Sequence, residues 1–300
     1  MFSVSRAAGF VFIAATALSG AATGPAQEST PAEQNSLRVC ADPNNLPYSN
    51  DQQQGFENRI ATLVANDLGK KVEYFWFRQG EKFFRRTLNS GVCDVVMGVP
   101  AGLNEAATTQ PYYRSTYVFV TRKSSGLPIT SLDDPRLLTV KIGVHILGDS
   151  KDSLPPVHAL ISRGIVKNLV GYSIFGNLNE KDPPADLMRA LESGQVDVAL
   201  MWGPLAGYFS KKSSVPLVLT PIPEDKLNPE LPFHFDIAIG VRANDTAMKQ
   251  IMERELERRK VEIQGVLNAY GVPQVEIPQT AQHMQAADHA EPHAGPGRNE

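Results

Sequence analysis

Short apolar runs alternate with segments of helical spacing along the first part of the chain. Apolar residues recur from Ile60 to Leu68 at the spacing of one helix face, and Gly69 is placed to end that helix. The predicted strands are 37–41, 72–77, 93–98 and 117–123, and the predicted helices are 56–68 and 81–88. Alternating strands and helices favour parallel pairing, so this part predicts an α/β lobe.

The same alternation returns after a linker of turn-forming residues at 124–135. Strands are predicted at 140–144, 169–175, 196–201 and 235–241, and helices at 156–163, 185–193 and 245–270. The long last helix has Asp245 at its N-cap and Gly271 just past its end. The apolar run 235–241 lies where a chain would cross back from a second lobe to the first.

One sequence motif occurs twice, and a second pair of similar segments has the same separation along the chain. LNSGVCDVVMG begins at Leu88 and LESGQVDVALM begins at Leu191, which is 103 residues later. LRVCAD at Leu37 and VKIGVH at Val140 are also 103 residues apart. The repeat predicts two lobes built on one plan, with corresponding strands at this offset.

These patterns divide the chain into two lobes and two flanking segments. Lobe one is predicted to be discontinuous, 37–123 plus 234–272, and lobe two to be 124–233. The tail 273–300 is polar and carries His283, His289 and His293. Such a tail can hold a metal ion loosely, but its composition favours disorder.

The N-terminus has the features of a secretory signal peptide. In residues 1–26 one arginine precedes an apolar stretch from Ala7 to Leu18, and small residues follow up to Ala26. The stretch is shorter than the ~20 apolar residues of a membrane span. A polar linker follows at 27–36. We therefore expect a soluble mature protein exported to the periplasm.

Charge excludes some partners, whereas the cysteines leave two alternatives open. The 300-residue chain has a net charge of −3 and a pI near 6.1, so it offers no basic field for nucleic acid or an anionic membrane. Its two cysteines, Cys40 and Cys93, either form a disulfide in an exported protein or are small buried side chains on neighbouring strands. Neither their number nor their spacing suits a zinc site, and no cofactor is expected.

Several segments together resemble the type II periplasmic solute-binding proteins, most closely the amino-acid-binding family. They are LRVCADPNNLPYS, GFENRIATLVANDLG, LNSGVCDVVMG, QPYYRSTYVFVTRK, SLDDPRLLTVKIGV and ALESGQVDVAL. The resemblance runs from about Leu37 to Tyr270. It implies two Rossmann-like lobes joined by two hinge strands, with a ligand cleft between them.

Four segments resemble one branch of that family more closely: ADPNNLPYSN, GFENRIA, GVCDVVMGVPAG and TQPYYRSTYVFVTR. This branch is associated with periplasmic quinoprotein dehydrogenases, as the accessory J type found beside methanol dehydrogenase. The resemblance implies a protein that serves a PQQ- and metal-containing alcohol dehydrogenase, for example during maturation.

In this fold a ligand lies against the carboxyl ends of the parallel strands. The candidate cleft residues are Asn44, Asn45, Tyr48, Trp76, Pro100, Gly102, Tyr113, His145, Asp149, Trp202 and Gly203. Asn44 and Asn45 equally suit a turn, and Asp149 equally suits an N-cap. Trp76 and Phe77 point to opposite faces of their strand, so one of them at most reaches the cleft. Trp202 stands in a loop-like Gly-Pro context.

The charged clamp of an amino-acid binder is missing. The resemblance implies an arginine after the third strand of lobe one and an acid after the matching strand of lobe two. Here Val99 is followed by Pro-Ala-Gly-Leu-Asn-Glu-Ala, and Trp202 stands where the acid is expected. A buried zwitterion would leave its charges unpaired, which costs several kcal/mol. We expect no tight binding of free amino acids.

Three functions are compatible with the sequence. The first is an accessory protein whose apolar cleft binds a protein partner, such as a dehydrogenase subunit or segment. The second is the receptor of an ABC transporter for a small neutral or apolar solute. The third is an exported dehydratase, for which Glu57 and Glu105 are the only acids at suitable positions. Neither has a visible His or Arg partner, and the sequence favours a binding protein over an enzyme.

Overall fold

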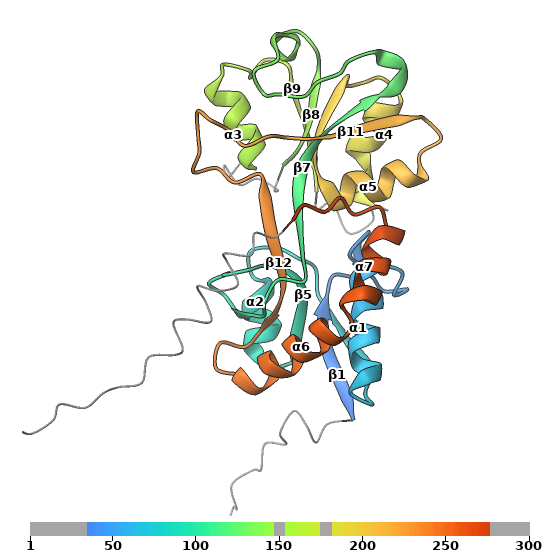
Figure 1. Cartoon of the computed structure of the whole chain (residues 1–300), viewed down its shortest axis with the longest axis vertical. Helices are drawn as coiled ribbons and strands as arrows, with labels where there is room; N and C mark the ends of the chain where they lie inside the picture. Colours follow the sequence, from blue (N-terminus) through green and yellow to red (C-terminus); the bar gives the residue numbers. More distant parts are fainter. Residues whose placement is uncertain (1–34, 147–153, 175–181, 277–300) are drawn as a thin grey trace, which may run out of the picture.

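The computed structural model describes residues 35–146, 154–174 and 182–276. They form two α/β lobes, one above the other in Figure 1. Two strands join the lobes, β7 (Tyr113–Arg122) and β12 (His234–Val241). The predicted fold class is confirmed by this arrangement and by the order of the strands.

Lobe one is built on a sheet in the order β4-β1-β5-β12. Its strands are β4 (Lys71–Trp76), β1 (Ser36–Ala41) and β5 (Val95–Pro100), with β12 antiparallel to β5 and the short β6 (Ala107–Thr108) beside β12. A ribbon of β2 (Asn44–Asn45) and β3 (Ser49–Asn50) follows β1. The helices are α1 (Phe56–Asp67), α2 (Phe83–Arg86), α6 (Thr246–Arg258), α7 (Lys260–Ala269) and the 3₁₀ turn η1 (Leu88–Ser90).

Lobe two repeats this order as β9-β8-β10-β7. Its strands are β9 (Leu169–Ser173), β8 (Ile142–Ile146) and β10 (Val198–Trp202), with β11 (Leu217–Pro221) antiparallel to β7. Its helices are α3 (Pro155–Ser162), α4 (Asp186–Glu192) and α5 (Gly203–Lys212). The 3₁₀ turns are η2 (Lys123–Ser125), η3 (Pro135–Leu138) and η4 (Pro183–Ala185).

The offset of 103 residues holds in the strand register as well as in the sequence. Val39 lies opposite Val95 in lobe one, and Ile142 lies opposite Val198 in lobe two. Each residue of the second pair is 103 positions after its counterpart. The predicted correspondence of the two lobes is therefore confirmed at the level of individual residue pairs.

The repeated aspartate has the same structural role in both lobes. The Asp94 carboxylate accepts a hydrogen bond from the backbone N–H of Arg38 at 3.1 Å, and Asp197 accepts one from Lys141 at 2.9 Å. An arginine at the end of the returning strand lies 3.6 Å from each carboxylate, Arg242 in lobe one and Arg122 in lobe two. The aspartate thus ties its own strand to the first strand of the lobe.

The hinge strand β7 changes partners partway along its length. Residues Tyr113 to Thr116 pair with β12, whereas Tyr117 to Arg122 pair with β10 and β11. The sequence predicted that lobe one extends to 123, but the change of sheet comes earlier, between Thr116 and Tyr117. At the crossing, Arg114 donates two hydrogen bonds to Asp236 of β12, at 2.7 and 2.6 Å.

Several elements differ from the sequence-based prediction. The helix expected at 245–270 is two helices that meet at Arg259, whose side chain forms an ion pair with Asp67 of α1. The helix expected at 81–88 is only four residues long before η1 follows. Helix α5 and strand β11 were not predicted. The Gly203-Pro204 pair looked like a loop, but proline is well suited to the first turn of a helix.

The segment 271–276 was assigned mainly to the tail, yet it packs along the hinge. The Pro273 carbonyl accepts a hydrogen bond from Ser115 Oγ at 2.6 Å. The Val275 N–H donates to the Arg114 carbonyl at 3.1 Å. The ordered chain therefore continues past α7 and covers part of β7. The predicted signal peptide and the rest of the predicted tail lie outside the described residues.

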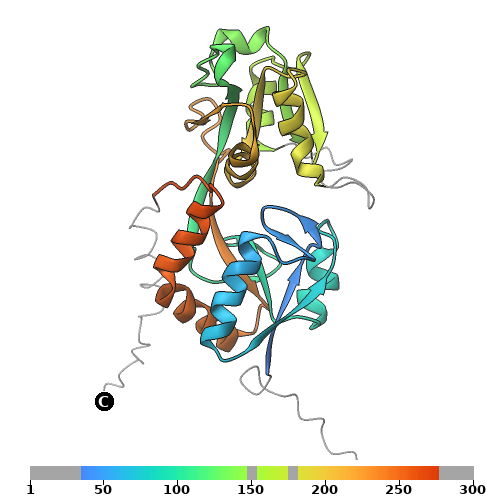
Figure 2. The same ribbon diagram turned by 90° about the vertical axis from the view of Figure 1, so that its right-hand side faces the viewer.

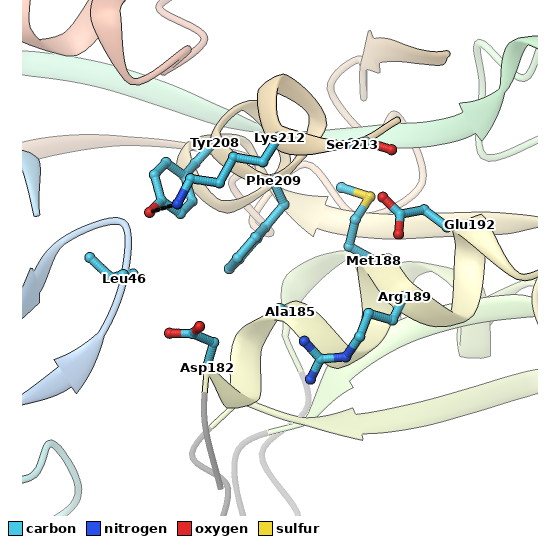
Figure 3. A pocket seen from close by; sticks show the side chains of 10 residues that line it. All are labelled: Leu46, Asp182, Ala185, Met188, Arg189, Glu192, Tyr208, Phe209, Lys212 and Ser213. Atoms are coloured by element: carbon cyan, nitrogen blue, oxygen red, sulfur yellow. Dashed lines mark hydrogen bonds between the residues drawn. The ribbon is translucent and has the colours of Figure 1, made fainter. Parts of the chain in front are cut away.

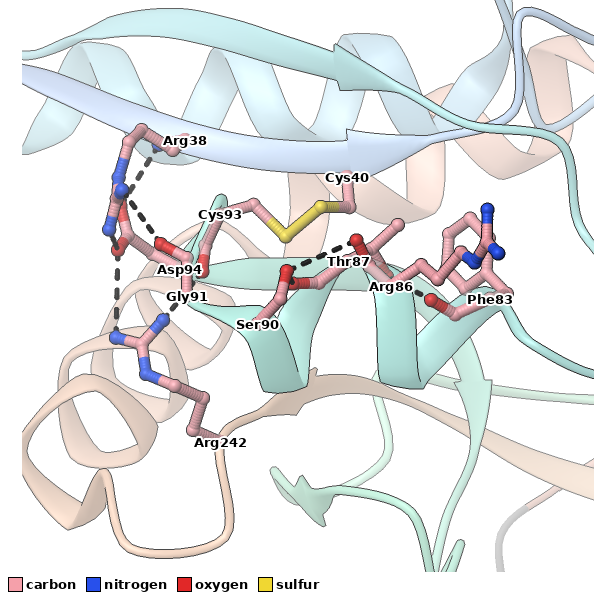
Figure 4. Close-up of a disulfide and its surroundings, with 10 residues drawn as sticks. All are labelled: Arg38, Cys40, Phe83, Arg86, Thr87, Ser90, Gly91, Cys93, Asp94 and Arg242. Carbon is pink, nitrogen blue, oxygen red and sulfur yellow. Dashed lines mark hydrogen bonds and ion pairs between the residues drawn. A yellow bond between two sulfur atoms is a disulfide. The ribbon is translucent and has the colours of Figure 1, made fainter.

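The two cysteines form a disulfide, which decides between the alternatives left open by the sequence. Cys40 on β1 and Cys93 just before β5 have a Cα–Cα distance of 5.6 Å. Both belong to a small apolar cluster that also contains Phe83 and Leu88. Figure 4 shows this bond between the strand that carries Cys40 and the helical turns of α2 and η1. It joins β1 to the turn between η1 and the neighbouring strand β5.

Candidate functional site

The loop that follows β1 is held by one buried carboxylate. Asp42 accepts hydrogen bonds from the N–H groups of Asn44 and Gln79, at 2.8 and 2.7 Å. Asn45 donates its side-chain amide to the Gln79 side chain at 3.2 Å. The predicted cleft residues Asn44 and Asn45 therefore belong to a braced ribbon. Residues 78–82 are tied to the same ribbon through Gln79.

A buried acid stands at the start of α1. Glu57 is 7 % exposed, and its carboxyl group lies against Gly98 near the end of β5. A Cβ on Gly98 would come within 1.7 Å of Glu57 Oε1, and Gly98 has a φ of +68°. Burial raises the pKa of Glu57 to about 8. At neutral pH most molecules therefore carry Glu57 as the uncharged acid, which donates one hydrogen bond and accepts others.

Tyrosines surround this acid. Burial is the main cause of a raised pKa at Tyr48, Tyr74, Tyr112 and Tyr113, and the charge of Glu57 adds to it at each. Tyr48 and Tyr113 both make edge contacts with the Phe56 ring, at centroid distances of 5.4 and 6.1 Å. The Glu57 carboxyl group is therefore surrounded by aromatic rings, and the tyrosines among them also carry hydroxyl groups.

Two polar atoms near this acid make no hydrogen bond of good geometry within the described part of the chain, although the Gly98 backbone interacts with Tyr112 and Tyr74 interacts with the Asn58 side chain. They are Asn58 Nδ2 and the Tyr112 hydroxyl, both buried. Asn58 Oδ1 accepts hydrogen bonds from the N–H groups of Gly55 and Asn50, at 3.0 and 3.3 Å. Buried polar groups are normally paired. An amide donor and a hydroxyl beside a neutral acid can bind an uncharged polar group.

Three aromatic rings meet where the hinge strands cross. Trp202 contacts Tyr117 of β7 and Phe235 of β12 edge-on, at centroid distances of 5.1 and 5.7 Å. We call Tyr117, Trp202 and Phe235 the aromatic triad. Trp202 is partly exposed. It is the last residue of β10 and directly precedes α5, so the predicted loop-like context was wrong.

Three of the predicted cleft residues do not offer a free side chain in this conformation. Tyr113 is 3 % exposed and lies in the core. His145 is 1 % exposed, and its Nε2 lies 3.2 Å from the Pro184 carbonyl, a pairing that needs a protonated Nε2. Burial lowers the pKa of His145 to about 4, so the ring is neutral near pH 7. Gly203 is buried, and a Cβ there would lie 2.6 Å from the Thr116 carbonyl oxygen.

The remaining predicted residues lie at or near the strand ends. Pro100 and Gly102 are exposed after β5, and the Gly102 N–H donates to Thr108 Oγ1 at 3.1 Å. Trp76 stacks on Tyr74, with ring centroids 4.4 Å apart. Phe77 packs in the cluster around the disulfide, so the prediction of opposite faces is confirmed. Asp149 lies outside the described residues. A contact role for any of these residues remains a prediction.

A cavity of about 230 Å³ lies between lobe two and one residue of lobe one. Figure 3 shows its apolar side chains, among them Leu46, Met188 and Phe209. Charged side chains stand at its rim, with Asp182 and Lys212 at the end nearest Leu46 and Glu192 at the other. Its lining comes mainly from α4 and α5.

Helix α5 is clasped to the end of α7, so the lobes touch beside the hinge. The rings of Tyr208 and Tyr270 are stacked, with centroids 5.9 Å apart. A cation lies over each ring, Lys212 at 4.1 Å from the Tyr208 centroid and Arg59 at 5.5 Å from the Tyr270 centroid. Lys211 Nζ donates to the carbonyls of Asn268 and Ala269, both at 3.0 Å. We call this contact between α5 and α7 the clasp.

The clasp depends on a glycine. A Cβ on Gly207 would lie 1.8 Å from the Gly271 carbonyl oxygen, so Gly207→Ala requires α5 to move away from α7. We expect a loss of about 1–3 kcal/mol in the free energy of unfolding, although alanine favours a helix. Gly265→Ala on α7 meets open space and is the matched control. Urea unfolding of both variants tests this. Equal stability of the two would show that the close approach is absent in solution.

Comparison with known proteins defines the class. Residues 37–264 match the bacterial extracellular solute-binding proteins, family 3. The match covers most of the chain, which therefore belongs to this family. It is a binding protein rather than an enzyme, as its family and its relatives are. In the described part of the chain, no group of three His, Cys, Asp or Glu side chains is placed to hold a metal ion. There, too, every helix is too short or too polar to cross a membrane.

Particular relatives narrow the class further. The chain is 34 % identical over 258 residues to protein MoxJ of Methylorubrum extorquens AM1, an alignment that covers 84 % of this chain and 86 % of MoxJ. The crystal structure of the periplasmic binding protein XoxJ from Methylobacterium extorquens AM1 is 34 % identical, with a TM-score of 0.66 over 80 % of this chain and 100 % of XoxJ. That of MxaJ from Methlophaga aminisulfidivorans MPT is 29 % identical, with a TM-score of 0.69 and the same coverage. The chain is thus a MoxJ- and XoxJ-like solute-binding protein.

Sequence reasoning missed part of this site. Tyr117 and Phe235 lie inside long apolar strands, where aromatic residues normally indicate core packing. Only the crossing of β7 and β12 brings them to Trp202. Glu57 was considered as a catalytic acid without a partner. Its neighbour Gly98 is far away in sequence, and the GFE and MGV segments give no signal of their contact.

Proposed function

We propose that this chain is an exported accessory protein that serves a PQQ-dependent alcohol dehydrogenase. Its cleft would engage a subunit or segment of that enzyme during maturation or activation. The proposal is supported by the segments that resemble the dehydrogenase-associated branch and by the similarity to MoxJ and XoxJ. It includes cleavage of the N-terminal 26 residues on export to the periplasm.

The observation that carries the proposal is the aromatic triad at the crossing. Trp202 occupies the place of the expected acid, and its neighbours are two more rings rather than a charge. Aromatic anchors of this kind are frequent hot spots of protein interfaces. Because the residues that the structure describes place no charged clamp there for a zwitterion, the site favours an apolar side chain of a protein segment.

The surroundings of Glu57 favour a second candidate, a transporter receptor for a small neutral solute. The Asn58 amide and the Tyr112 hydroxyl, which make no hydrogen bond of good geometry within the described residues, suit an uncharged polar ligand. An accessory protein would bind a protein subunit or segment, whereas a transporter receptor would bind a small solute. The mass of the bound species distinguishes the two functions and can be measured directly. A receptor must also change its lobe angle on binding, against the clasp between α5 and α7.

The test is affinity capture from the native periplasm of cells grown on an alcohol. We expect a quinoprotein dehydrogenase subunit to co-purify, identified by mass spectrometry. Trp202→Ala should weaken its binding at least about tenfold, as expected for a hot spot, whereas Trp202→Phe keeps a ring and retains most of it. A native mass with a retained small molecule and no dehydrogenase would favour the receptor. Unchanged binding in both variants would show that the Trp202 ring is not the anchor.

A further inference from the structure

Four basic side chains lie close together in sequence after strand β4. They are Arg78, Lys82, Arg85 and Arg86, which we call the basic strip. Lys82, Arg85 and Arg86 are exposed and Arg78 is half-buried. The only acid within the same stretch is Glu81. This local excess of positive charge stands out in a chain with a net charge of −3.

The basic strip has no ionic partners within the described residues. Its four side chains take part in no ion pair or side-chain hydrogen bond there, and in Figure 4 no dashed line reaches the Arg86 guanidinium. Most other arginines of the described chain are paired, among them Arg38, Arg114 and Arg163. Unpaired arginines are therefore concentrated in this strip, and their charge is available to a partner.

The strip rests on a braced base. Thr87 Oγ1 donates to the Phe83 carbonyl at 2.7 Å, and the rings of Phe77 and Phe83 are 6.4 Å apart above the disulfide cluster. Phe75, which is 39 % exposed, lies opposite Cys40 in the strand register. Because the backbone is already ordered, binding here costs less entropy than on a mobile loop. Arginine and exposed aromatic side chains are both enriched at protein interfaces.

The strip is continuous with the wall of the candidate cleft. Gln79 lies next to Arg78, and both its N–H and its side chain are bonded to the loop after β1, through Asp42 and Asn45. The start of the strip, at Arg78, is therefore adjacent in the chain to a residue bonded to this loop.

We propose that the basic strip is a docking surface for an acidic segment of a protein partner. The inference rests on the proposed function only in taking this partner to be the protein that the cleft engages. Carboxylates on the partner would pair with the unpaired guanidinium groups, and an apolar side chain beside them would cover Phe75. Long-range attraction between such surfaces accelerates association and weakens as salt is added.

The test uses the full mature chain and two double variants of equal charge change. Arg85→Glu/Arg86→Glu reverses the strip, and Lys226→Glu/Arg254→Glu reverses two exposed basic residues elsewhere. The probes are poly-L-glutamate and the dehydrogenase recovered by capture, at about 50 and 200 mM salt. We expect the strip variant to bind poly-L-glutamate about tenfold more weakly at low salt and to associate with the dehydrogenase about tenfold more slowly. The control should stay within about twofold of wild type. Thermal unfolding shows whether each variant is folded.

Each other outcome has a defined meaning. Equal losses in both double variants would overturn the proposal, because net charge alone would then explain binding. Binding to phosphatidylglycerol vesicles, lost in the strip variant while poly-L-glutamate binding is unchanged, would assign the strip to a membrane surface and also overturn it. If the strip variant weakens dehydrogenase binding but Trp202→Ala does not, the docking surface stands and the proposed role of the cleft fails. If Trp202→Ala weakens dehydrogenase binding but the strip variant does not, the docking surface is rejected and the proposed role of the cleft stands.

Discussion

Replacing Glu57 by glutamine should stabilise the protein at pH 8 and remove most of its loss of stability between pH 6.5 and 8.5. The pKa of Glu57 is about 8 in the folded protein against 4.5 for an ordinary glutamate. Between these values the unfolded chain releases its proton and the folded chain retains it. Stability is therefore fully present below about pH 4.5 and declines as the pH rises through 8. With about 1.4 kcal/mol per unit, the wild type loses up to about 5 kcal/mol between pH 4.5 and 8, of which about 2 kcal/mol falls between pH 6.5 and 8.5.

Urea unfolding at several pH values between 6.5 and 8.5 measures this effect. Glutamine keeps the shape and the hydrogen-bonding capacity of the neutral acid but cannot ionise. The window lies above the range in which His145 matters, since its lowered pKa costs stability only as the pH falls from about 6.5 towards 4. Glu105→Gln, at an exposed acid, is the matched control. Parallel curves for the wild type and Glu57→Gln would mean that water or a ligand reaches the carboxyl group in solution.

The two-lobed fold could be predicted because its determinants are local and repeated. The phrase Leu-x-Ser-Gly-x-x-Asp-Val encodes a turn, an aspartate and a buried strand within a few residues. The aspartate bonds to the neighbouring strand in the same way in both lobes, at Asp94 and at Asp197. Because the same contact is made in both lobes, the same motif occurs twice in the sequence. That repetition allowed the two-lobed architecture to be predicted.

Structural features that depend on contacts between residues far apart in the sequence produce no repeated motif of this kind. The helix expected at 245–270 is interrupted at Arg259, whose side chain pairs with Asp67, far away on α1. His145 is buried because it reaches the Pro184 carbonyl, which lies on another element. The sequence placed His145 just after a strand, whereas it placed Arg259 in the middle of one long helix. What each side chain does there depends on residues that only the fold brings close.

The lobes also differ in how their second helical segment is attached. In lobe two, Gly143 and Val196 stand 103 residues after Cys40 and Cys93. Leu187 of α4 packs so closely on Gly143 that a Cβ there would lie 2.3 Å from Leu187 Cδ1. Helix α4 therefore covers its strand by side-chain packing. In lobe one the shorter α2 and η1 pack instead on the cluster that contains the disulfide.

Removing that bond with Cys40→Ala/Cys93→Ala should therefore destabilise lobe one more than lobe two. The bond closes a loop across a sequence separation of 53 residues. The chain-entropy estimate for such a loop is about 4 kcal/mol of stability. Urea unfolding measures the loss. Hydrogen exchange locates it, with faster exchange expected across Phe83–Ser90 and little change across Asp186–Glu192.

The same double variant connects stability to docking. If the disulfide holds the base under Arg85 and Arg86, then its loss should weaken poly-L-glutamate binding under conditions in which the protein is still folded. The cationic side chains themselves remain, so any weakening reflects the cost of ordering α2 on binding. Cys40→Ala alone is a poor substitute, because it leaves a free thiol at Cys93. Unchanged exchange across Phe83–Ser90 would show that the apolar cluster around Phe83 and Leu88 suffices to hold the segment, as packing does in lobe two.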